Sequence, residues 1–535
     1  MSSTADIVKN RFLGLLIWQS IHSTVIFVLV RTLLLAPFVS RSSFFPSLEA
    51  CLSFIVFHLS LLLFSVSVFL SASPQACRPA SLFDLALALL RFLFVPSAAA
   101  PAADFCRRAK ISLSLLLLVA VSAMSGFLSL VSLCGWLNSD YVFGGAVGLR
   151  GLAHGIMYGL YYVFKHRWVL NYPIIQRPIF FSFKVGFPGA VRQALKLSSA
   201  SYLISAFLVV FLTDRHKGYS TIGKFIGEQI IFYIGSFVVF LCFELSHHLH
   251  QVLLTKRFIF APPKGSAAAE TNPSEHLLAA LEESTPRSLL HYLAYLDLCM
   301  VCERNVDTWR RAAFFEETAE TYKRVVAACV RPLEQFVLKL GEGLESCSVD
   351  NTWQLSNQLG PPTDSCIESK FYELFNDSQL FAWCARAVAS LTAHSHREDR
   401  CGVAQLSGSN AVVISTLLSC LLAVETLMGK KTNLQSHQLT GPAGIRWATL
   451  NTGRKDATTA IMGKKRGGPL HVKAYALADV MRTTVYCIVS AFHGEMLRND
   501  KARLLEDWIV SSKPLYGTRE LLLHKLRLFL DFQAC

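Results

Sequence analysis

Long apolar segments fill the first half of the chain, whereas the second half is mostly polar and is expected to hold no further long apolar segment. Six segments carry few or no charged residues, at positions 12–30, 50–73, 111–137, 141–164, 197–213 and 225–246. A helix rises about 1.5 Å per residue and the hydrocarbon core is roughly 30 Å thick, so about 20 apolar residues cross it. Because backbone groups must bond internally in that layer, the pattern predicts an all-α polytopic membrane protein with six transmembrane helices.

Composition and charge agree with a membrane protein. Of the 535 residues 52% are apolar, and the mean hydropathy is +0.40. Positions 1–246 hold 19 Lys and Arg against 8 Asp and Glu, while the rest holds 32 against 29. Most of the net charge of +14 therefore lies in the membrane half, which favours lipid headgroups over nucleic acid as its partner. The fifteen Cys show no disulfide spacing and are expected to be reduced.

The loops predict the orientation. Basic residues gather in the N-terminal tail, in the second and fourth loops and after the last helix, and they are scarce in the other loops. The positive-inside rule therefore places both termini on the cytoplasmic side. The sequon at Asn376-Asp377-Ser378 would lie on that side too, and we expect it to be unused.

A short amphipathic segment at 81–94 lies in the second loop. It begins with Ser81 and Asp84, which resemble a capping box. The segment is too short and too charged to be a good membrane-spanning helix. We expect an in-plane helix at the headgroup boundary, of the kind that is sensitive to membrane curvature. A re-entrant or bundle-packed stub is the alternative.

The fourth span combines small and ionisable residues. Gly151, Gly155 and Gly159 recur at four-residue spacing and predict a close approach by a neighbouring helix. Arg150 and His154 lie on the same helix, and a charge in hydrocarbon is a functional hypothesis by default.

Two glutamates of the last span, Glu228 and Glu244, are candidates to neutralise Arg150. A transporter or channel would use this intramembrane polar set as a pathway for substrate or protons. The simpler interpretation is a buried ion pair that locks two helices together. No internal repeat relates the two halves of the membrane region, as many transporters would require.

The fourth loop, 165–196, mixes aromatic and basic residues, which is typical of the headgroup layer. Pro173, Pro178 and Pro188 in this loop exclude one long helix.

The second half divides into four parts. A linker at 247–274 leads to a helical cytoplasmic domain at 275–427, a disordered basic loop at 428–470 and amphipathic helices at 471–535. Lys464, Lys465 and Arg466 form the core of the basic loop, which offers contacts to phosphate or acidic lipid but is more simply a solvated segment.

No catalytic constellation is evident. Cys299 and Cys302 form a single CxxC within a helical pattern, without a second pair at zinc spacing. A membrane-bound enzyme of lipid metabolism would have only the His247–His250 cluster to use, and a polar belt at the headgroups explains that cluster as well. We therefore expect no enzymatic activity, cofactor or metal.

One block after the linker supports a family resemblance. It reads Leu289-Leu-His-Tyr-Leu-Ala-Tyr-Leu-Asp297-Leu, followed by Trp309-Arg-Arg-Ala-Ala-Phe-Phe315. With the six spans and the long helical second half, it resembles the NDC-type (nuclear division cycle) transmembrane nucleoporins. The residues that carry the resemblance, and that would form a partner site, are Leu293, Asp297, Arg310, Arg311, Phe314 and Phe315.

The resemblance implies a scaffold at the nuclear pore membrane, which tethers soluble nucleoporins and supports pore assembly. It implies as partners the envelope bilayer, a nucleoporin with an RRM-like domain and an amphipathic helix, and a WD-repeat nucleoporin of the ALADIN type. Self-association is compatible with it, and no direct contact with nucleic acid is expected. The transporter or channel remains the alternative.

Overall fold

The computed structural model describes residues 4–34, 48–77, 79–81, 83–88, 103–134, 141–212, 222–263, 265–353, 370–433, 468–497 and 503–534. It divides into two compact units, Met1–Arg257 and Phe258–Cys535. The described residues of both units are helical and contain no strand, apart from one isolated bridge between Ser73 and Val169.

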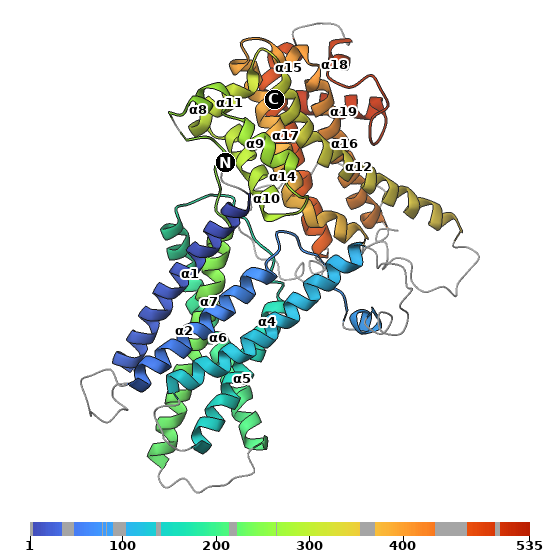
Figure 1. The fold of residues 1–535 in the computed structure, drawn as a ribbon. Coiled ribbons are helices and arrows are strands. Elements are labelled where there is room, and N and C mark those ends of the chain that lie inside the picture. The colour runs from blue at the N-terminus through green and yellow to red at the C-terminus, as the bar shows by residue number, and fades with distance from the viewer. Residues whose placement is uncertain are drawn as a thin grey trace, which may run out of the picture. The chain divides into compact units, whose positions relative to one another are not determined.

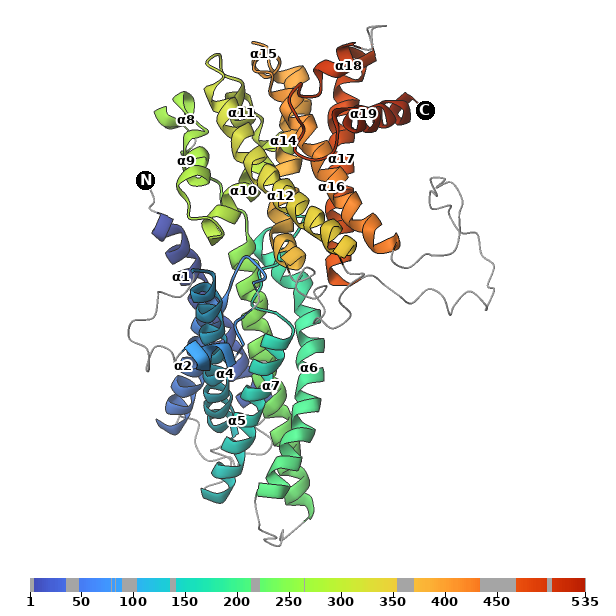
Figure 2. The same ribbon diagram turned by 90° about the vertical axis from the view of Figure 1, so that its right-hand side faces the viewer.

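The first unit is a bundle of six long helices (Figures 1 and 2). They are α1 (Thr4–Leu29, extended by a π-helical turn at Val30–Leu34), α2 (Leu48–Ser71), α4 (Ala103–Cys134), α5 (Tyr141–Phe164), α6 (Ile179–Leu212) and α7 (Ile222–Thr255). Each of the six apolar segments predicted from the sequence coincides with one of these helices, except that Ala72 and Ser73 follow α2 and that 135–137 and 213 are outside the described residues. The longest helices have 34 residues, or about 51 Å, and so exceed the roughly 30 Å hydrocarbon core.

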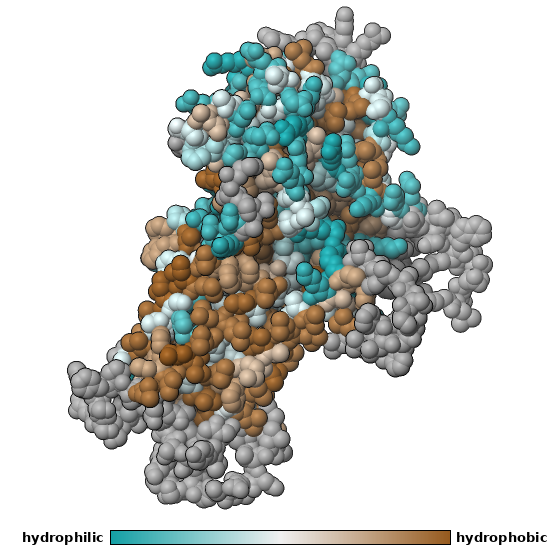
Figure 3. Space-filling model, viewed as in Figure 1, coloured by the Kyte–Doolittle hydropathy of each residue, from teal (hydrophilic) through white to brown (hydrophobic). Residues whose placement is uncertain are grey.

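The surface of this unit is apolar. Side chains such as Leu63, Leu116 and Leu203 are about half exposed or more, and brown, hydrophobic residues cover the face of the bundle seen in Figure 3. Monomeric soluble proteins rarely expose so much contiguous apolar surface. Four helices of this unit are long and apolar enough to cross a membrane among the residues searched. The chain is therefore a helical, multi-pass membrane protein.

Inside the bundle, small polar side chains join the helices. Ser60 of α2 bonds Ser129 of α4 at 2.7 Å, and Ser125 donates to the Ser60 carbonyl at 2.9 Å. In α1, Arg11 donates to the carbonyls of Leu253 and Leu254 at the end of α7, each at 2.7 Å. Such bonds satisfy groups that would otherwise be unpaired in hydrocarbon.

Two boundaries expected from the sequence differ from the structure. The expected linker at 247–274 begins with the last turns of α7, which ends at Thr255, and it also contains the short helix α8 (Ala267–Thr271). The fourth loop is non-helical only over 165–178, as expected around Pro173 and Pro178. From Ile179 onward it belongs to α6, which continues through Pro188 against the expectation. Pro188 is exposed, so the bond that it cannot donate is lost on the outer side of the bundle.

The capping box at the start of 81–94 is present. The Asp84 amide donates to Ser81 Oγ at 3.0 Å, and the Ser81 amide donates to the Asp84 carboxylate at 3.3 Å. Residues 83–88 are helical, with Phe83 exposed, while 89–94 lie outside the described residues. Whether this helix lies in the membrane plane stays a prediction.

The second unit is a bundle of shorter helices, built around α10 and α14. Its helices are α8, α9 (Glu275–Glu283), α10 (Leu289–Glu303), α11 (Thr308–Ala312), α12 (Glu320–Trp353), α14 (Ser378–Glu398), α15 (Val403–Leu406), α16 (Ser409–Asn433), α17 (Pro469–Leu497), α18 (Arg503–Asp507) and α19 (Arg519–Ala534). α14 packs against both α10 and α17, and α16 packs against both α12 and α17. Hydrophilic residues predominate on the face of this unit seen in Figure 3.

One helix of the second unit contradicts the expectation that this half has no long apolar segment. Ser409–Gly429, within α16, is long and apolar enough to cross a membrane, but 72% of its apolar window is buried inside the unit, against 28–50% for the four helices of the first unit. A helix surrounded by other helices buries its apolar side chains without lipid. We therefore assign α16 to the core of the second unit.

Candidate functional site

Three helices hold Arg150 in the interior of the first unit. From α5, its guanidinium donates to the side-chain carbonyl of Gln229 on α7 at 3.1 Å, and that oxygen also accepts the Tyr202 hydroxyl of α6 at 2.7 Å. The guanidinium also lies 4.3 Å from the ring centroid of Phe232. Hydrogen bonds and a cation–π contact thus stabilise this charge within the bundle.

One turn along α5, the fully buried His154 joins the same helices. Its two ring nitrogens bond the hydroxyls of Ser201 on α6 and Ser236 on α7, the latter at 2.6 Å. With both nitrogens occupied, the imidazole serves as a bridge between helices. The prediction that Arg150 and His154 form part of one polar set is therefore consistent with the geometry, in which they connect α5 to α6 and α7.

The two glutamates lie at different depths along α7. Glu244 forms a bidentate ion pair with Arg167, which follows α5, and one of the two bonds measures 2.8 Å. The hypothesis that Glu244 neutralises Arg150 is therefore wrong. Glu228 is half-buried near the start of α7, next to Gln229. In the sequence Arg167 is one of the basic residues of the fourth loop that indicate the orientation, and its ion pair was not predicted.

The glycine stripe of α5 packs against α4. A Cβ on Gly155 would lie 2.0 Å from the Ser122 carbonyl oxygen, and one on Gly151 would lie 2.6 Å from the Gly126 carbonyl oxygen. On Gly159 it would meet Val119 at 3.0 Å. The prediction of a close helix approach is confirmed, because only glycine leaves room for the α4 backbone at this distance.

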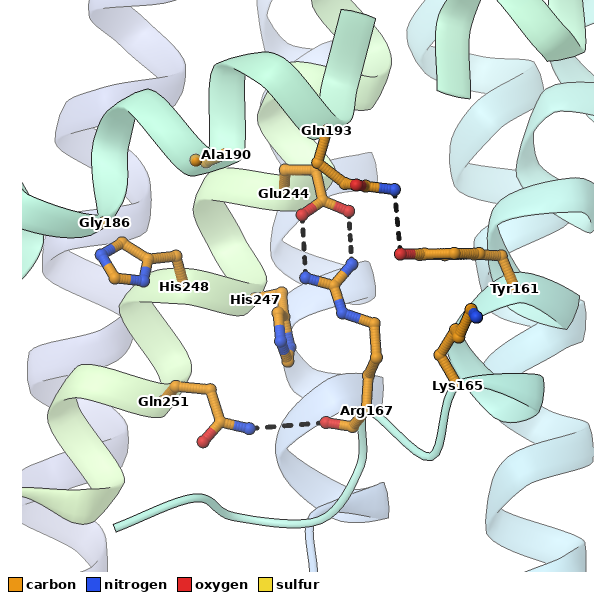
Figure 4. A pocket seen from close by; sticks show the side chains of 11 residues that line it. Tyr161, Lys165, Arg167, Gly186, Ala190, Gln193, Glu244, His247, His248 and Gln251 are labelled. Carbon is orange, nitrogen blue, oxygen red and sulfur yellow. Dashed lines mark hydrogen bonds and ion pairs between the residues drawn. The ribbon is translucent and has the colours of Figure 1, made fainter. Parts of the chain in front are cut away.

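A polar pocket of about 360 Å³ opens where α5 ends, α6 begins and α7 ends (Figure 4). Its walls are Tyr161, Lys165, Arg167, Gly186, Gly189, Ala190, Gln193, Glu244, His247, His248 and Gln251. The Arg167–Glu244 pair crosses its centre, and Gln193 donates to the Tyr161 hydroxyl at 2.9 Å beside the pair. Neither Arg150 nor His154 lines it.

The loop after α5 is fixed against the end of the bundle. The amide of Ser73 donates to the Trp168 carbonyl at 3.0 Å, and the Leu170 amide donates to the Ser73 carbonyl at 2.9 Å. Gln251 of α7 donates to the carbonyl of Val169 at 3.2 Å and accepts the amide of Asn171 at 3.1 Å. These backbone bonds hold Arg167 in place next to Glu244.

The residues that carry the family resemblance are buried in the second unit. Leu293, Phe314 and Phe315 belong to its core. Asp297 accepts two bonds from Arg310, at 2.8 and 3.3 Å, and both side chains are at most 1% exposed. These side chains therefore offer no surface to a partner, which corrects that part of the site expectation.

Arg311 is enclosed in the same way. It pairs with Glu398 of α14, with one bond at 2.8 Å, and it donates to the Cys302 carbonyl of α10 at 3.2 Å. This arginine thus ties α11 to α10 and α14, and its role is structural.

The CxxC cysteines and the basic loop are the two remaining candidates from the sequence. Cys299 and Cys302 are buried in α10, and burial raises the pKa of each thiol well above its usual range. A thiol that stays protonated is a poor nucleophile and ligand, so we assign both cysteines to the core of the second unit. The basic residues Lys464, Lys465 and Arg466 lie outside the described residues, as does 434–467 as a whole.

Among the residues that the structure describes, no group of three or more His, Cys, Asp and Glu side chains could hold a metal ion. The chemistry that the described arrangement offers is the binding of a polar or charged group in the pocket at the end of α5, α6 and α7. A scan of protein-family models finds no family that matches this chain, and a search of curated proteins finds no significant match to it.

Proposed function

We propose that this protein is a membrane-anchoring scaffold of the nuclear pore, of the NDC type, with six spans and both termini on the cytoplasmic or pore side. In this role it tethers soluble nucleoporins to the pore membrane and supports the assembly and insertion of pores. The family resemblance of the sequence is the origin of the proposal.

The division of the chain is the observation that most supports it. The first unit exposes an apolar helical surface, and the second is a large helical bundle with a polar surface and a tightly locked interior. A tether needs an anchor in lipid and a rigid body that other proteins bind. Arg310 and Arg311 supply rigidity rather than contacts, so partner helices would bind elsewhere on the second unit.

The buried polar groups of the bundle favour a scaffold over a transport pathway. Both ring nitrogens of His154 and the carbonyl of Gln229 are occupied by contacts between helices. We therefore expect Arg150→Ala to lower protein abundance, whereas a transport group would lose flux while the protein accumulated normally.

The test is localisation of the endogenous protein, tagged at its C-terminus and imaged at super-resolution beside a pore marker. We expect punctate rings that coincide with pores, and fewer pores after the protein is depleted. An unrelated multi-span protein of the endoplasmic reticulum with the same tag is the control. A reticular or plasma-membrane signal would overturn the proposal.

The orientation is tested separately in sealed membrane vesicles with the cytoplasmic face outward. We expect added protease to remove the C-terminal tag without detergent. A tag that is digested only after the membrane is dissolved would contradict the cytoplasmic placement of the second unit.

A further inference from the structure

The pocket at the end of α5, α6 and α7 has more positive than negative charge. Lys165 and Arg167 face one carboxylate, Glu244, among its walls. Arg167 and Glu244 satisfy each other in a bidentate pair. The Lys165 ammonium makes no ion pair with any residue that the structure describes, and it lies 5.9 Å from the centroid of the Phe164 ring. One cation is thus left for a ligand.

The pocket also has polar atoms available for a ligand. The imidazole of His247 is buried, and its Nδ1 has no hydrogen-bond partner among the described residues. Gln193 uses one amide hydrogen on Tyr161 and retains the other. A buried polar atom such as His247 Nδ1 is costly without a partner, and a ligand that bonds to it would remove that cost. The half-buried Gln193 offers a second donor.

Small residues on α6 leave space for the ligand. A Cβ on Gly189 would meet nothing within 4 Å, so the wall is open there. At Gly186 a Cβ would collide with the His248 ring at 2.0 Å, which shows how closely that imidazole lies against α6 (Figure 4).

Apolar side chains flank the polar cavity. Phe180, Phe181, Val185 and Phe187 of α6 are all exposed, by 43–66%. A polar pocket next to exposed aromatic and aliphatic side chains matches an amphiphile, whose headgroup and acyl chains need both surfaces.

The position of the pocket along the helices agrees with this match. Lys165 directly follows the apolar segment 141–164, Glu244 lies at the end of 225–246, and Gln193 precedes 197–213 by about one turn. All three therefore lie at one edge of the hydrocarbon layer, where the phosphates of lipid headgroups are found.

We propose that this pocket binds the phosphate of an anionic phospholipid headgroup, with Lys165 as its unpaired cation and His247 and Gln193 as hydrogen-bond partners. A soluble phosphate ester offers the same phosphate chemistry without acyl chains. Lipid binding at this site is independent of where in the cell the protein resides, so it stands or falls apart from the scaffold proposal.

The test uses the purified full-length protein in detergent micelles, titrated with phosphatidylglycerol, phosphatidylcholine or glycerol 3-phosphate, with bound species counted by native mass spectrometry. We expect phosphatidylglycerol to bind in preference to phosphatidylcholine, and Lys165→Glu to weaken it about tenfold or more, the equivalent of one charged hydrogen bond. Gly189→Phe should also weaken binding, because it fills the cavity without changing the charge.

Lys184→Glu is the matched control, since Lys184 is an exposed cation of α6 that does not line the pocket. Monodisperse elution of each variant establishes that it is folded, and Lys165→Gln replaces Lys165→Glu if it is not. Saturable binding of glycerol 3-phosphate that Lys165→Glu removes would support the phosphate site and assign it to a soluble ester. Equal affinity for the two lipids, or equal losses in Lys165→Glu and Lys184→Glu, would overturn the proposal.

Discussion

Removal of either partner of the Asp297–Arg310 pair should unfold the second unit at a markedly lower temperature. The carboxylate and the guanidinium are at most 1% exposed and make two hydrogen bonds to each other. They also hold the backbone at Phe260, whose amide donates to Asp297 at 3.0 Å and whose carbonyl accepts from Arg310 at 3.0 Å. Asp297→Ala would leave Arg310 as a buried charge without its partner.

The size of the effect follows from this burial. Breaking a buried pair by removing one partner costs about 3–5 kcal/mol, whereas exposed pairs contribute about 0–1 kcal/mol. At roughly 2–4 °C per kcal/mol for a unit of this size, Asp297→Ala should lower the melting temperature by about 6–20 °C. Asp297→Leu combined with Arg310→Met should cost less than the two single changes summed, because neither charge is then left unpaired.

The buried cysteines supply the assay. A fluorogenic maleimide reacts with Cys299 and Cys302 of α10 only after the second unit opens, and mass spectrometry assigns the label to each cysteine during a thermal ramp. Arg324→Met is the matched control, since Arg324 pairs with Glu282 at the surface. If Asp297→Ala shifted the labelling temperature no further than Arg324→Met, the reasoning from burial would be refuted.

Three further predictions concern other contacts. Gly155→Leu should force α4 and α5 apart and reduce the monodisperse fraction in size-exclusion chromatography, whereas Gly14→Leu, with open space around its Cβ, should elute like the wild type. At pH 8 iodoacetamide should alkylate the exposed Cys401 at least about a hundredfold faster than Cys302, whose pKa is raised by burial, and comparable rates would contradict the buried core. Asn376 is buried and accepts a bond from Lys473, so endoglycosidase should leave the mass unchanged.

Hydropathy located the membrane helices well but said little about their ends. The predicted fourth span coincides with α5, because polar residues bound it on both sides. By contrast α6 begins eighteen residues before the apolar segment at 197, because a helix in the headgroup layer needs no apolar sequence. Because Pro188 was taken to end any helix, the first half of α6 was not predicted. The helical wall of the pocket, which this half forms, was therefore not predicted either.

Composition alone also could not separate a membrane span from a core helix. Ser409–Gly429 is as apolar as the helices of the first unit, and its apolar side chains are satisfied by neighbouring helices instead of lipid. What distinguishes the two environments is the tertiary burial of the helix, which a single sequence does not contain. The same limit applies to Asp297 and Arg310, whose types and spacing gave no sign that they are enclosed.

The partner of Glu244 was within reach of sequence reasoning. In a six-span topology the fourth and sixth helices run in the same direction, so residues pair when they lie at equal depth. Arg150 is nine residues into the segment that begins at 141 and Glu244 is nineteen into the one that begins at 225, a difference of about 15 Å along the helix axis. By the same count Arg167 lies seven residues from Glu244, closer in depth than Arg150 with ten, and the structure shows that Arg167 is the partner. The ion-pair partner of a charged residue inside a membrane bundle is best sought first among residues at a similar depth and then by opposite charge.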